Sequence, residues 1–289
     1  YYENNISPLN SLRNLIKSNK LKIPNQIPSI SSGLFGYMGY EMIQYFEKVI
    51  LSKKNNLELP DSIFIRPSMT LVFDNVNDKL FITRTVFPYG KDPIQSFNKA
   101  KKDIINLTKK INKPLNKNSL ELQSFKKGID VFKDVKSNTD YNDFKKMVEK
   151  AKKLIYEGEI FQVVLSRIFK KKIKNKPLSI YRALRHLNPS PYLFYMSFKD
   201  FTIVGSSPEI LIKLDDKKVT IRPIAGTRKR GINKHEDDKL KNDLLNDSKE
   251  ISEHLMLLDL GRNDISRVSQ PGTVKVTDKM YIEYFSHVM

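Results

Sequence analysis

Apolar residues recur at helical spacing in the second half of the chain and predict its clearest helix. Either Thr139 or Asp140 can cap the start of this helix, and Gly158 can end it. Its apolar stripe consists of Phe144, Met147, Val148, Ala151, Leu154 and Ile155. A stripe of this width is typical of a helix that packs one face against a core.

The same periodicity predicts further helices nearer the C-terminus. One covers residues 180–186, and a longer pattern covers residues 237–260. The longer pattern is broken near Asn246, where Asp247 or Ser248 can cap a second helix. We therefore expect two consecutive helices in this stretch.

Short apolar runs bounded by turn residues predict the strands. They cover residues 69–73, 79–83, 161–169, 193–198, 201–205, 209–213 and 219–223. Links of hairpin length, such as Lys199-Asp200, join neighbouring runs. Hairpins followed by helices indicate antiparallel sheets, so the predicted fold class is α+β rather than a dinucleotide-binding α/β pattern.

Three glycines, Gly33, Gly36 and Gly39, recur every third residue among aromatic side chains. Glycines in an apolar strand often mark a close approach of two backbones. The spacing differs from phosphate-binding loops, because no strand–loop–helix unit with an acidic partner follows. We therefore expect a packing role, followed by a helical segment over residues 40–49.

Composition narrows the class of protein. The 289 residues are 39% hydrophobic with 16 Phe and 13 Tyr, enough for a packed core in one large domain or two ordinary ones. No apolar run reaches the length of a membrane span, and Tyr1 opens a polar stretch rather than a signal peptide. We therefore expect a cytoplasmic protein. Cysteine is absent, which excludes disulfides, thiolate metal sites and a cysteine nucleophile in this chain.

The formal net charge of +19 raises the question of nucleic-acid binding. Only 11 of the 51 basic residues are Arg, and the Lys residues are scattered with Asn and Ile along the whole chain. Proteins that read bases and phosphates use Arg clusters and interleaved aromatics, and neither is concentrated here. We expect weak, non-specific nucleic-acid binding at most, and compositional bias explains the charge better.

A Gly–Thr turn follows the last predicted strand, within residues 222–228. Its backbone N–H groups, the Thr227 hydroxyl and the neighbouring Arg228 suit a small carboxylate ligand. Glu250 and Glu253 lie three residues apart on the following helix and so share one face. Such a pair either faces water, which is the commoner case, or shares a cation.

Two further polar residues stand in apolar surroundings. Gln162 lies in the run 161–169 and needs a hydrogen-bond partner, either in a structural network or in a pocket. Glu209 follows a polar break and begins a predicted strand. A carboxylate at a strand end is either a plain surface group or a catalytic one.

Six motifs carry a family resemblance. They are GLFGYMGYE (33–41), GEIFQVVLSRIF (158–169), NPSPYLFY (188–195), GSSPEIL (205–211), RPIAGTRKRG (222–231) and SKEISEHLMLLDLGRNDISRVSQPG (248–272). In this order they resemble the chorismate-utilising enzymes, and the anthranilate synthase component I group in particular. The resemblance covers nearly the whole chain.

The resemblance implies a fold and a division of the chain. The family fold is a large α+β unit, with two mostly antiparallel sheets in a sandwich and helices outside, in agreement with the predicted strands. We expect an N-terminal region over residues 1–120, a linker over residues 121–138 and a chorismate-binding catalytic region over residues 139–289.

The resemblance also implies a reaction. Chorismate is aminated with loss of its ring hydroxyl, and pyruvate is then eliminated to give anthranilate, in a process that needs Mg²⁺. Glu253 and Glu250 match the family's magnesium helix, and paired oxygen ligands suit a hard dication. Glu209 matches the proposed general acid for the departing hydroxyl, a role that needs a proton held near neutral pH. Gly226 and Thr227 match positions that contact the chorismate carboxylate.

Two positions separate the branches of this family. Isochorismate and salicylate synthases carry a Lys where this chain has Gln162, because water needs a base and ammonia does not. Aminodeoxychorismate synthases typically place a nucleophilic Lys where this chain has Ala225. The combination of Gln162, as a catalytic-site residue, with Ala225 therefore resembles the residues that anthranilate synthases carry at these two positions. Aminodeoxychorismate synthase and 2-amino-2-deoxyisochorismate synthase remain as alternatives, and the latter can share this pair.

Partners follow from the same resemblance. Glutaminases of this pathway use a Cys–His pair, and the chain has no Cys. A separate glutamine amidotransferase subunit is therefore implied as the source of ammonia. Pro191, Tyr192 and Leu193 resemble part of the family's tryptophan feedback pocket, whereas the alternative is a rigid Pro-rich turn over a packed aromatic.

The family's chains normally run well past Met289. A catalytic His, further chorismate contacts and a second acidic magnesium ligand normally follow. We therefore expect a fragment that lacks part of its active site, exposes apolar sheet edges and has no synthase activity alone.

Overall fold

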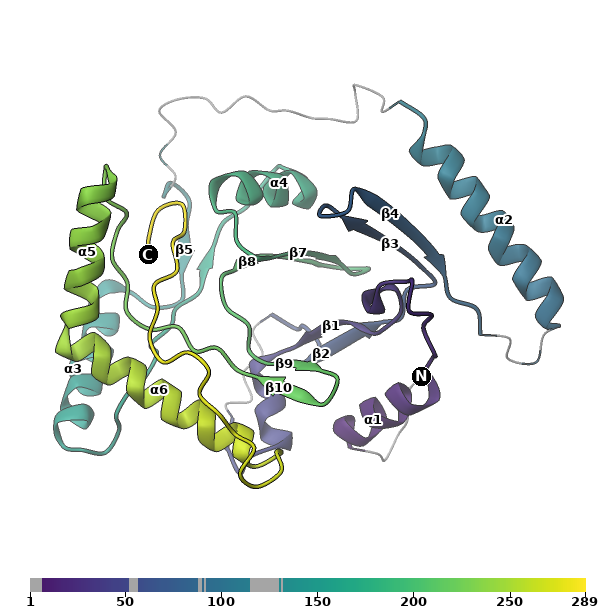
Figure 1. Cartoon of the computed structure of the whole chain (residues 1–289). Helices are drawn as coiled ribbons and strands as arrows, with labels where there is room; N and C mark the ends of the chain where they lie inside the picture. The colour runs from purple at the N-terminus through teal and green to yellow at the C-terminus, as the bar shows by residue number, and fades with distance from the viewer. Residues whose placement is uncertain (1–6, 52–56, 88–89, 91, 115–129, 131) are drawn as a thin grey trace. The chain divides into compact units, whose positions relative to one another are not determined.

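The computed structural model describes residues 7–51, 57–87, 90, 92–114, 130 and 132–289. The chain forms two compact units, residues 1–120 and 121–289 (Figure 1). Most of the segment that we expected to be a linker, 121–129 and 131, lies outside the described residues.

The described part of the first unit contains two antiparallel strand pairs and two α-helices. Its elements are α1 (Pro8–Ser18), η1 (Ser29–Ser31), β1 (Phe35–Met38), η2 (Tyr40–Tyr45), β2 (Ser62–Ile65), β3 (Met69–Asp74), β4 (Lys79–Arg84) and α2 (Pro93–Ile111). β1 pairs with β2, β3 pairs with β4, and α2 packs against β4. The strands predicted over residues 69–73 and 79–83 are confirmed to within one residue.

Close backbone contact explains one of the three spaced glycines. A Cβ on Gly36 would lie 1.8 Å from the Ile63 carbonyl oxygen on the paired strand, so β1 and β2 require glycine there. The segment after these glycines is a short 3₁₀ helix, Tyr40–Tyr45, rather than a longer α-helix. The expected packing role of the glycines therefore holds at Gly36.

The second unit carries all the candidate site residues. Its elements are α3 (Tyr141–Tyr156), β5 (Lys136–Ser137), β6 (Phe169–Lys170), α4 (Pro177–Leu187), β7 (Tyr192–Ser197), β8 (Thr202–Ser207), β9 (Lys213–Asp215), β10 (Lys218–Thr220), α5 (Lys234–Asn246) and α6 (Ser248–Ser266). α3 begins where predicted, because Asp140 Oδ1 accepts a hydrogen bond from the Asp143 N–H (2.8 Å). Asp247 separates α5 from α6 and caps the second helix, as the interrupted pattern predicted.

Hairpins dominate the strands of this unit. β7 and β8 pair over their whole length, from Tyr192 opposite Ser207 to Ser197 opposite Thr202, and α4 packs on both (Figure 1). The β9–β10 turn places Asp216 and Lys217 at φ +40° and +66°, the two positive φ values of a tight hairpin turn. The predicted α+β class with antiparallel pairing is confirmed, and each described sheet has two strands.

Three predicted strands are wrong over most of their length, and one of them, predicted over residues 219–223, already ends at Thr220. Within residues 161–169 only Phe169 is in a strand. The preceding residue, Ile168, bonds Asn138 instead: its N–H donates to Asn138 Oδ1, and its carbonyl oxygen accepts from the Asn138 N–H. Residues 209–212 are irregular as well, and strand β9 begins at Lys213. An apolar run forms a strand only where another strand meets its N–H and C=O groups, and sequence composition does not supply that neighbour.

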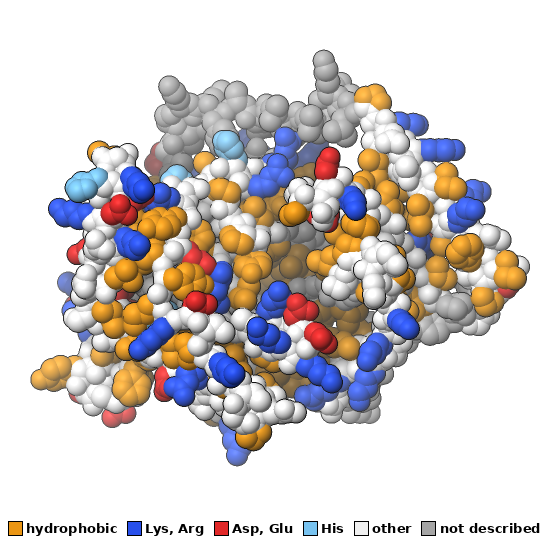
Figure 2. Space-filling view, in the orientation of Figure 1, with side chains coloured by type: hydrophobic (Ala, Val, Ile, Leu, Met, Phe, Trp, Pro, Cys, Tyr) orange, Lys and Arg blue, Asp and Glu red, His pale blue; other side chains and the backbone are white. Residues whose placement is uncertain are grey.

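Hydrophobic side chains remain exposed across the described parts of both units. Met42, Ala100, Leu244 and Met289 are the buried hydrophobic residues, whereas Val164 and Leu211 are 86% and 91% exposed. Figure 2 shows hydrophobic side chains interspersed with Lys and Arg on the visible face. No helix in the described part of the chain is long and apolar enough to cross a membrane.

Candidate functional site

The Gly–Thr turn lies in an extended segment that leaves β10 and runs toward α5. Gly226 has a φ of +77°, which favours glycine. A Cβ at this position would meet Leu244 Cδ1 at 3.0 Å and Glu250 Oε2 at 3.3 Å. The turn therefore brings its backbone next to the Glu250 carboxylate, and the sequence permits this because residue 226 has no side chain.

Glu209 reaches the same segment from the end of β8. The Ile224 N–H donates to Glu209 Oε1 (3.0 Å), and Glu209 N–H donates to Ser207 Oγ (3.3 Å). Glu209 is exposed, so its second carboxylate oxygen remains accessible. The irregular segment after β8 thus places the Glu209 carboxylate against Ile224, which precedes Gly226 by two positions in the sequence.

The acidic residues of α6 have different partners. Glu253 is half-buried, and its Oε1 accepts a hydrogen bond from Gln162 Nε2 (3.2 Å). Glu250 lies one turn earlier and forms an ion pair with Arg228 (Nη1 to Oε1, 3.6 Å). Gln162 is exposed rather than buried in an apolar strand as the sequence suggested, and its side-chain partner is a candidate metal ligand 91 residues away in sequence.

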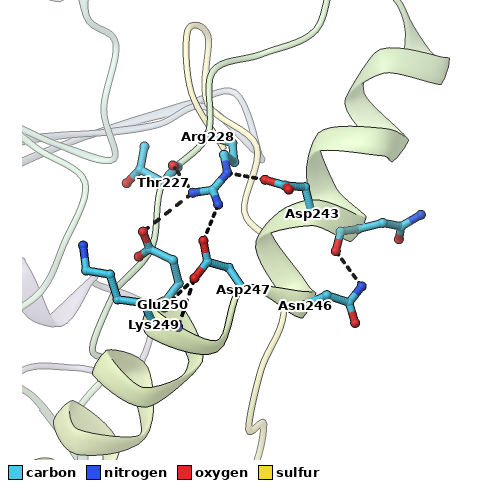
Figure 3. A network of polar contacts seen from close by, with 8 residues as sticks. Thr227, Arg228, Asp243, Asn246, Asp247, Lys249 and Glu250 are labelled. Atoms are coloured by element: carbon cyan, nitrogen blue, oxygen red, sulfur yellow. Dashed lines mark hydrogen bonds and ion pairs between the residues drawn. The ribbon is translucent and has the colours of Figure 1, made fainter.

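Arg228 is the centre of an ion-pair cluster at the α5–α6 junction (Figure 3). Its Nε lies 2.7 Å from Asp243 Oδ2, and its Nη2 lies 2.8 Å from Asp247 Oδ2. Its Nη1 donates to the Thr227 carbonyl oxygen (3.1 Å). Hydrogen bonds to Asp243 and then to Asp247 raise the pKa of Arg228. The guanidinium expected to face a ligand carboxylate is bound to three carboxylates of the protein instead.

Asp247 joins this cluster to the start of α6. Its Oδ1 accepts from the N–H groups of Lys249 (3.0 Å) and Glu250 (3.2 Å). The Glu250 backbone hydrogen bond, followed by the bond from Arg228, holds the pKa of Asp247 below its usual value. Asp247 therefore caps the helix and anchors Arg228 at the same time.

Arg230, two residues after Arg228, forms a second set of side-chain contacts that we also call a clamp, meaning an arginine held by carboxylate or carbonyl oxygens of another segment. Arg230 donates to Asp237 (Nη2 to Oδ2, 2.6 Å) and to the Phe285 carbonyl oxygen (2.8 Å). The hydrogen bond from Arg230, followed by one from the Gly231 N–H, lowers the pKa of Asp237. Arg230 therefore fixes the segment after the turn against the start of α5.

The turn segment also pairs with residues 285–289 through its backbone. Arg228 and Met289 exchange N–H···O bonds of 3.0 and 2.8 Å, and Arg230 N–H donates to the His287 carbonyl oxygen (3.1 Å). Lys229 and Val288 form the corresponding antiparallel bridge. The Gly226–Thr227 turn is thus held from both sides.

A cavity of about 380 Å³ lies beside the turn, between residues 220–226, α6 and residues 274–285. Most of its lining is apolar, with Glu250 and Gly226 among the lining residues. Arg222 and Glu283 form an ion pair in its wall (2.7 Å), and His254 hydrogen-bonds the Lys279 carbonyl oxygen (2.8 Å). The cavity joins the candidate site to the apolar face of α6.

Pro191, Tyr192 and Leu193 lie at the start of β7. Tyr192 and Leu193 are opposite Ser207 and Ser206 on β8, and Ser206 Oγ donates to the Asn188 carbonyl oxygen (2.8 Å). Pro191 and Tyr192 are exposed. The predicted feedback residues therefore neighbour the strand end that leads to Glu209.

The donor set on α6 suits a hard dication. Glu250 and Glu253 offer carboxylate oxygens one helical turn apart, and Mg²⁺ commonly uses one or two protein carboxylates together with water and substrate oxygens. The described residues contain no cluster of three or more acidic or His side chains that could enclose a metal alone. The chemistry of the Glu250 and Glu253 carboxylates suits a Mg²⁺ ion whose remaining ligands would be water and substrate oxygens.

Most predicted site residues meet in two adjoining groups. Glu209 and Glu250 lie beside the Gly226–Thr227 turn. Gln162 contacts Glu253, which follows Glu250 by one helical turn on α6. Sequence reasoning missed Asp243, which anchors Arg228 from 15 residues away. No local pattern marks it, since an acidic residue on an exposed helix face is ordinary.

The class of protein is thus an α+β unit in which a Gly–Thr turn lies next to the carboxylates of Glu209 and Glu250. The family model of the chorismate binding enzymes matches residues 3–289. The chain belongs to this family.

Individual relatives agree with this membership. The chain is 41% identical to anthranilate synthase component 1 of Cereibacter sphaeroides and 38% identical to that of Aquifex aeolicus, with 98% of this chain covered in each case. Its structure matches crystallographic anthranilate synthase component I of Streptococcus pneumoniae with a TM-score of 0.79 at 30% identity over 98% of this chain. The chain spans 56% of the length of the two curated relatives and 61% of the solved chain.

Proposed function

We propose that the chain is part of the large component of an anthranilate synthase. The reaction is Mg²⁺-dependent amination of chorismate by ammonia, followed by elimination of pyruvate to give anthranilate. The observation that carries the proposal is the hydrogen bond between Glu209 and Ile224, because it joins a candidate acid to the Gly226–Thr227 turn. The names of the similar proteins support it as well.

Each residue of the turn has a role in this proposal. Gly226 and Thr227 bind the ring carboxylate of chorismate through backbone N–H groups and the Thr227 hydroxyl. Glu209 is the proposed general acid that protonates the departing ring hydroxyl, which leaves as water while the new C–N bond forms. The Ile224 N–H fixes the Glu209 carboxylate for this transfer.

The α6 carboxylates have a separate role. Glu253 and Glu250 hold the Mg²⁺, and the ion, when bound, neutralises charge on substrate carboxylates. Gln162 positions Glu253 through its amide N–H, a second-sphere contact of a kind that tunes metal sites. The amide of Gln162 supplies no general base, which agrees with ammonia rather than water as nucleophile.

Two features favour anthranilate over the sister products. Ala225 provides no amine for covalent attack on the ring, in contrast to the lysine of aminodeoxychorismate synthases. Gln162 differs from the lysine of the water-adding branches. 2-Amino-2-deoxyisochorismate synthase shares both features and is the alternative that product analysis must separate.

The proposed partners follow from the chemistry. A separate glutamine amidotransferase subunit supplies the ammonia, since this chain has no Cys for a glutaminase pair. Tryptophan is the proposed feedback ligand near Pro191, Tyr192 and Leu193. A cytoplasmic location is proposed, where chorismate and glutamine are both available.

Product analysis tests the reaction. Chorismate, ammonia and Mg²⁺ are incubated with the 289-residue chain and with the longest protein that its gene encodes. The longer protein is expected to form anthranilate, identified by mass and fluorescence, whereas the 289-residue chain alone is expected to form none. Accumulation of 4-amino-4-deoxychorismate or of 2-amino-2-deoxyisochorismate in its place would assign the protein to a sister branch.

A substitution tests the metal residues. In the longer protein, Glu253→Gln is expected to raise the Mg²⁺ concentration for half-maximal activity by about tenfold or more, since metal-site contacts typically change affinity on that scale. Glu149→Gln, at an exposed ion pair on α3, serves as the control and should behave as the parent. Full activity and an unchanged Mg²⁺ response in Glu253→Gln would remove Glu253 from the metal site.

A further inference from the structure

Two arginines of the turn segment form similar clamps, but their surroundings differ. Arg228 binds Asp243 and Asp247 at 2.7 and 2.8 Å, and Arg230 binds Asp237 at 2.6 Å. Both arginines also hydrogen-bond residues 287–289 through their backbones. Arg228 in addition reaches Glu250, one of the two proposed metal ligands (Figure 3).

The contact between Arg228 and Glu250 is electrostatic. The Nη1–Oε1 distance of 3.6 Å is longer than a hydrogen bond, whereas the two aspartates are within hydrogen-bond distance. The Arg228 and Glu250 side chains are only 21% and 20% exposed, so solvent screens the pair incompletely. Glu250 therefore interacts with a fixed positive charge while its oxygens remain available to another cation.

The anchoring of Arg228 keeps this charge in place. Asp243 and Asp247 belong to the end of α5 and the cap of α6, and together they hold two of the three guanidinium nitrogens. The third nitrogen, Nη1, also donates to the Thr227 carbonyl oxygen (3.1 Å). One nitrogen thus lies between the proposed substrate turn and the proposed metal helix.

We propose that Arg228 is a positioning residue that competes with a divalent cation for the Glu250 carboxylate and so limits the metal affinity of α6. The proposal rests on the proposed function, since it takes Glu250 and Glu253 as metal ligands. A dication at Glu250 is repelled by the guanidinium, which its two aspartates prevent from moving away. Metal affinity is therefore set partly by a residue that is not a ligand.

Mn²⁺ binding to the full 289-residue chain provides a direct test without turnover. Mn²⁺ is titrated into the protein, and the free ion is measured by electron paramagnetic resonance. Arg228→Gln, which removes the charge, is expected to bind Mn²⁺ about tenfold more tightly than the parent. Arg228→Lys keeps the charge and should remain within about threefold of the parent.

Arg230→Gln is the matched control, because it loses a similar clamp on α5 without touching Glu250. Its Mn²⁺ affinity should equal that of the parent. In the double variant Arg228→Gln/Glu250→Gln the gain should disappear, since the competing partner is gone. Thermal unfolding by circular dichroism verifies that each variant is folded at the assay temperature.

A charge-balanced variant guards against misfolding. Arg228→Gln/Asp243→Asn removes one charge of each sign and allows the two amides to hydrogen-bond, and it should retain tighter Mn²⁺ binding than the parent. Unchanged or weaker binding in folded Arg228→Gln or in this variant overturns the proposal, as does a gain that persists without Glu250. Failure of every variant to bind Mn²⁺ overturns it too.

The proposed function is judged by a different readout, so the two can fail separately. A product other than anthranilate overturns the assigned reaction and leaves the Mn²⁺ result to stand. Anthranilate formation with equal Mn²⁺ affinity in the parent and Arg228→Gln overturns only the role of Arg228.

Discussion

Gly226 has a left-handed backbone conformation, and a Cβ at this position would closely approach Leu244 and Glu250. Gly272 has nearly the same φ, +78°, but a Cβ there would meet nothing within 4 Å. The two glycines therefore share the backbone strain that alanine would introduce and differ in their surroundings.

Gly226→Ala should lower the free energy of unfolding by about 2–3 kcal/mol, of which about 1–2 kcal/mol is backbone strain. Gly272→Ala should lower the free energy of unfolding only by the backbone strain that alanine introduces. Urea unfolding followed by circular dichroism measures both. Equal losses in the two variants would contradict the close contact between residue 226 and Glu250.

The lowered pKa of Asp247 leads us to expect that the stability of the chain depends on pH. Its pKa is lower in the folded chain than the usual 3.8, so its stabilising contribution is complete above pH 3.8 and is lost as the pH falls through the folded-state value. Asp247→Asn should therefore be less stable than the parent at pH 7, and the difference should shrink below pH 3.8. Urea unfolding between pH 3 and 7 tests this, with the exposed Asp264→Asn as control.

Residue identity predicted which side chains come close together better than it predicted the individual partners of each side chain. Gln162 was expected to need a hydrogen-bond partner within an apolar strand, but it is exposed, and its partner Glu253 lies 91 positions away. Arg228 next to a Gly–Thr turn suggested a ligand contact, and its actual partners come from two helices that pack together only in the folded chain. Side-chain chemistry specifies what a group requires, and tertiary structure decides which residue supplies it.

At the scale of elements, the β7–β8 hairpin depends on an aromatic residue opposite a glycine. Phe194 pairs with Gly205, and a Cβ on Gly205 would lie 2.0 Å from Phe194 Cζ. The ring therefore lies across the glycine backbone and covers it. This hairpin leads directly to Ser207 and Glu209.

Gly205→Ala should displace the Phe194 ring and lower the free energy of unfolding by about 1–3 kcal/mol. The smaller side chain in Phe194→Leu/Gly205→Ala should recover part of this loss relative to Gly205→Ala. Thermal unfolding of the three proteins provides the comparison. No recovery in the double variant would show that the loss does not arise from the ring.

Helices were predicted more accurately than strands, for a physical reason. The bonds of a helix lie within its own segment, so the apolar stripe and the Asp140 cap were sufficient to place α3. Residues 161–169 are as apolar as a buried strand, but only Phe169 is part of a ladder. A strand also needs a neighbour, and no neighbour can be predicted from the run itself.

At the scale of the whole molecule, exposed apolar side chains are the dominant feature of the described residues. Val164, Leu211 and Ile232, all in the second unit, are more than 85% exposed. Large apolar side chains exposed to water favour association of the chain with other molecules. These three side chains lie outside the described strands, so the expectation of exposed apolar sheet edges stays a prediction.

The 289-residue chain should therefore self-associate as its concentration rises, despite its net charge of +19. Val164→Lys/Leu211→Lys should shift the association to higher concentration, because both side chains lie on the surface. Sedimentation velocity over a range of concentrations measures the shift. Val219→Lys, at a less exposed position, is the contrasting variant and should destabilise the chain instead.

Family membership was predictable from the sequence because its motifs are contiguous segments that can be recognised without a fold. The positions of those segments relative to one another were not predictable in the same way. RPIAGTRKRG begins 26 residues before the helix motif at Ser248, but the contact that joins the motifs is the cluster around Arg228. That contact depends on the break between α5 and α6 at Asp247.

The backbone bridge between residues 228–230 and 287–289 has a consequence for the order of folding. The two segments are about 60 residues apart, and closing a loop of that length costs roughly 3–4 kcal/mol of chain entropy before the bridge can form. The α5–α6 pair, which is local, should form first and shorten the remaining search. In native-state hydrogen exchange, the amide protons of Arg228, Arg230 and Met289 should then open together and at a lower free energy than those in the middle of α6.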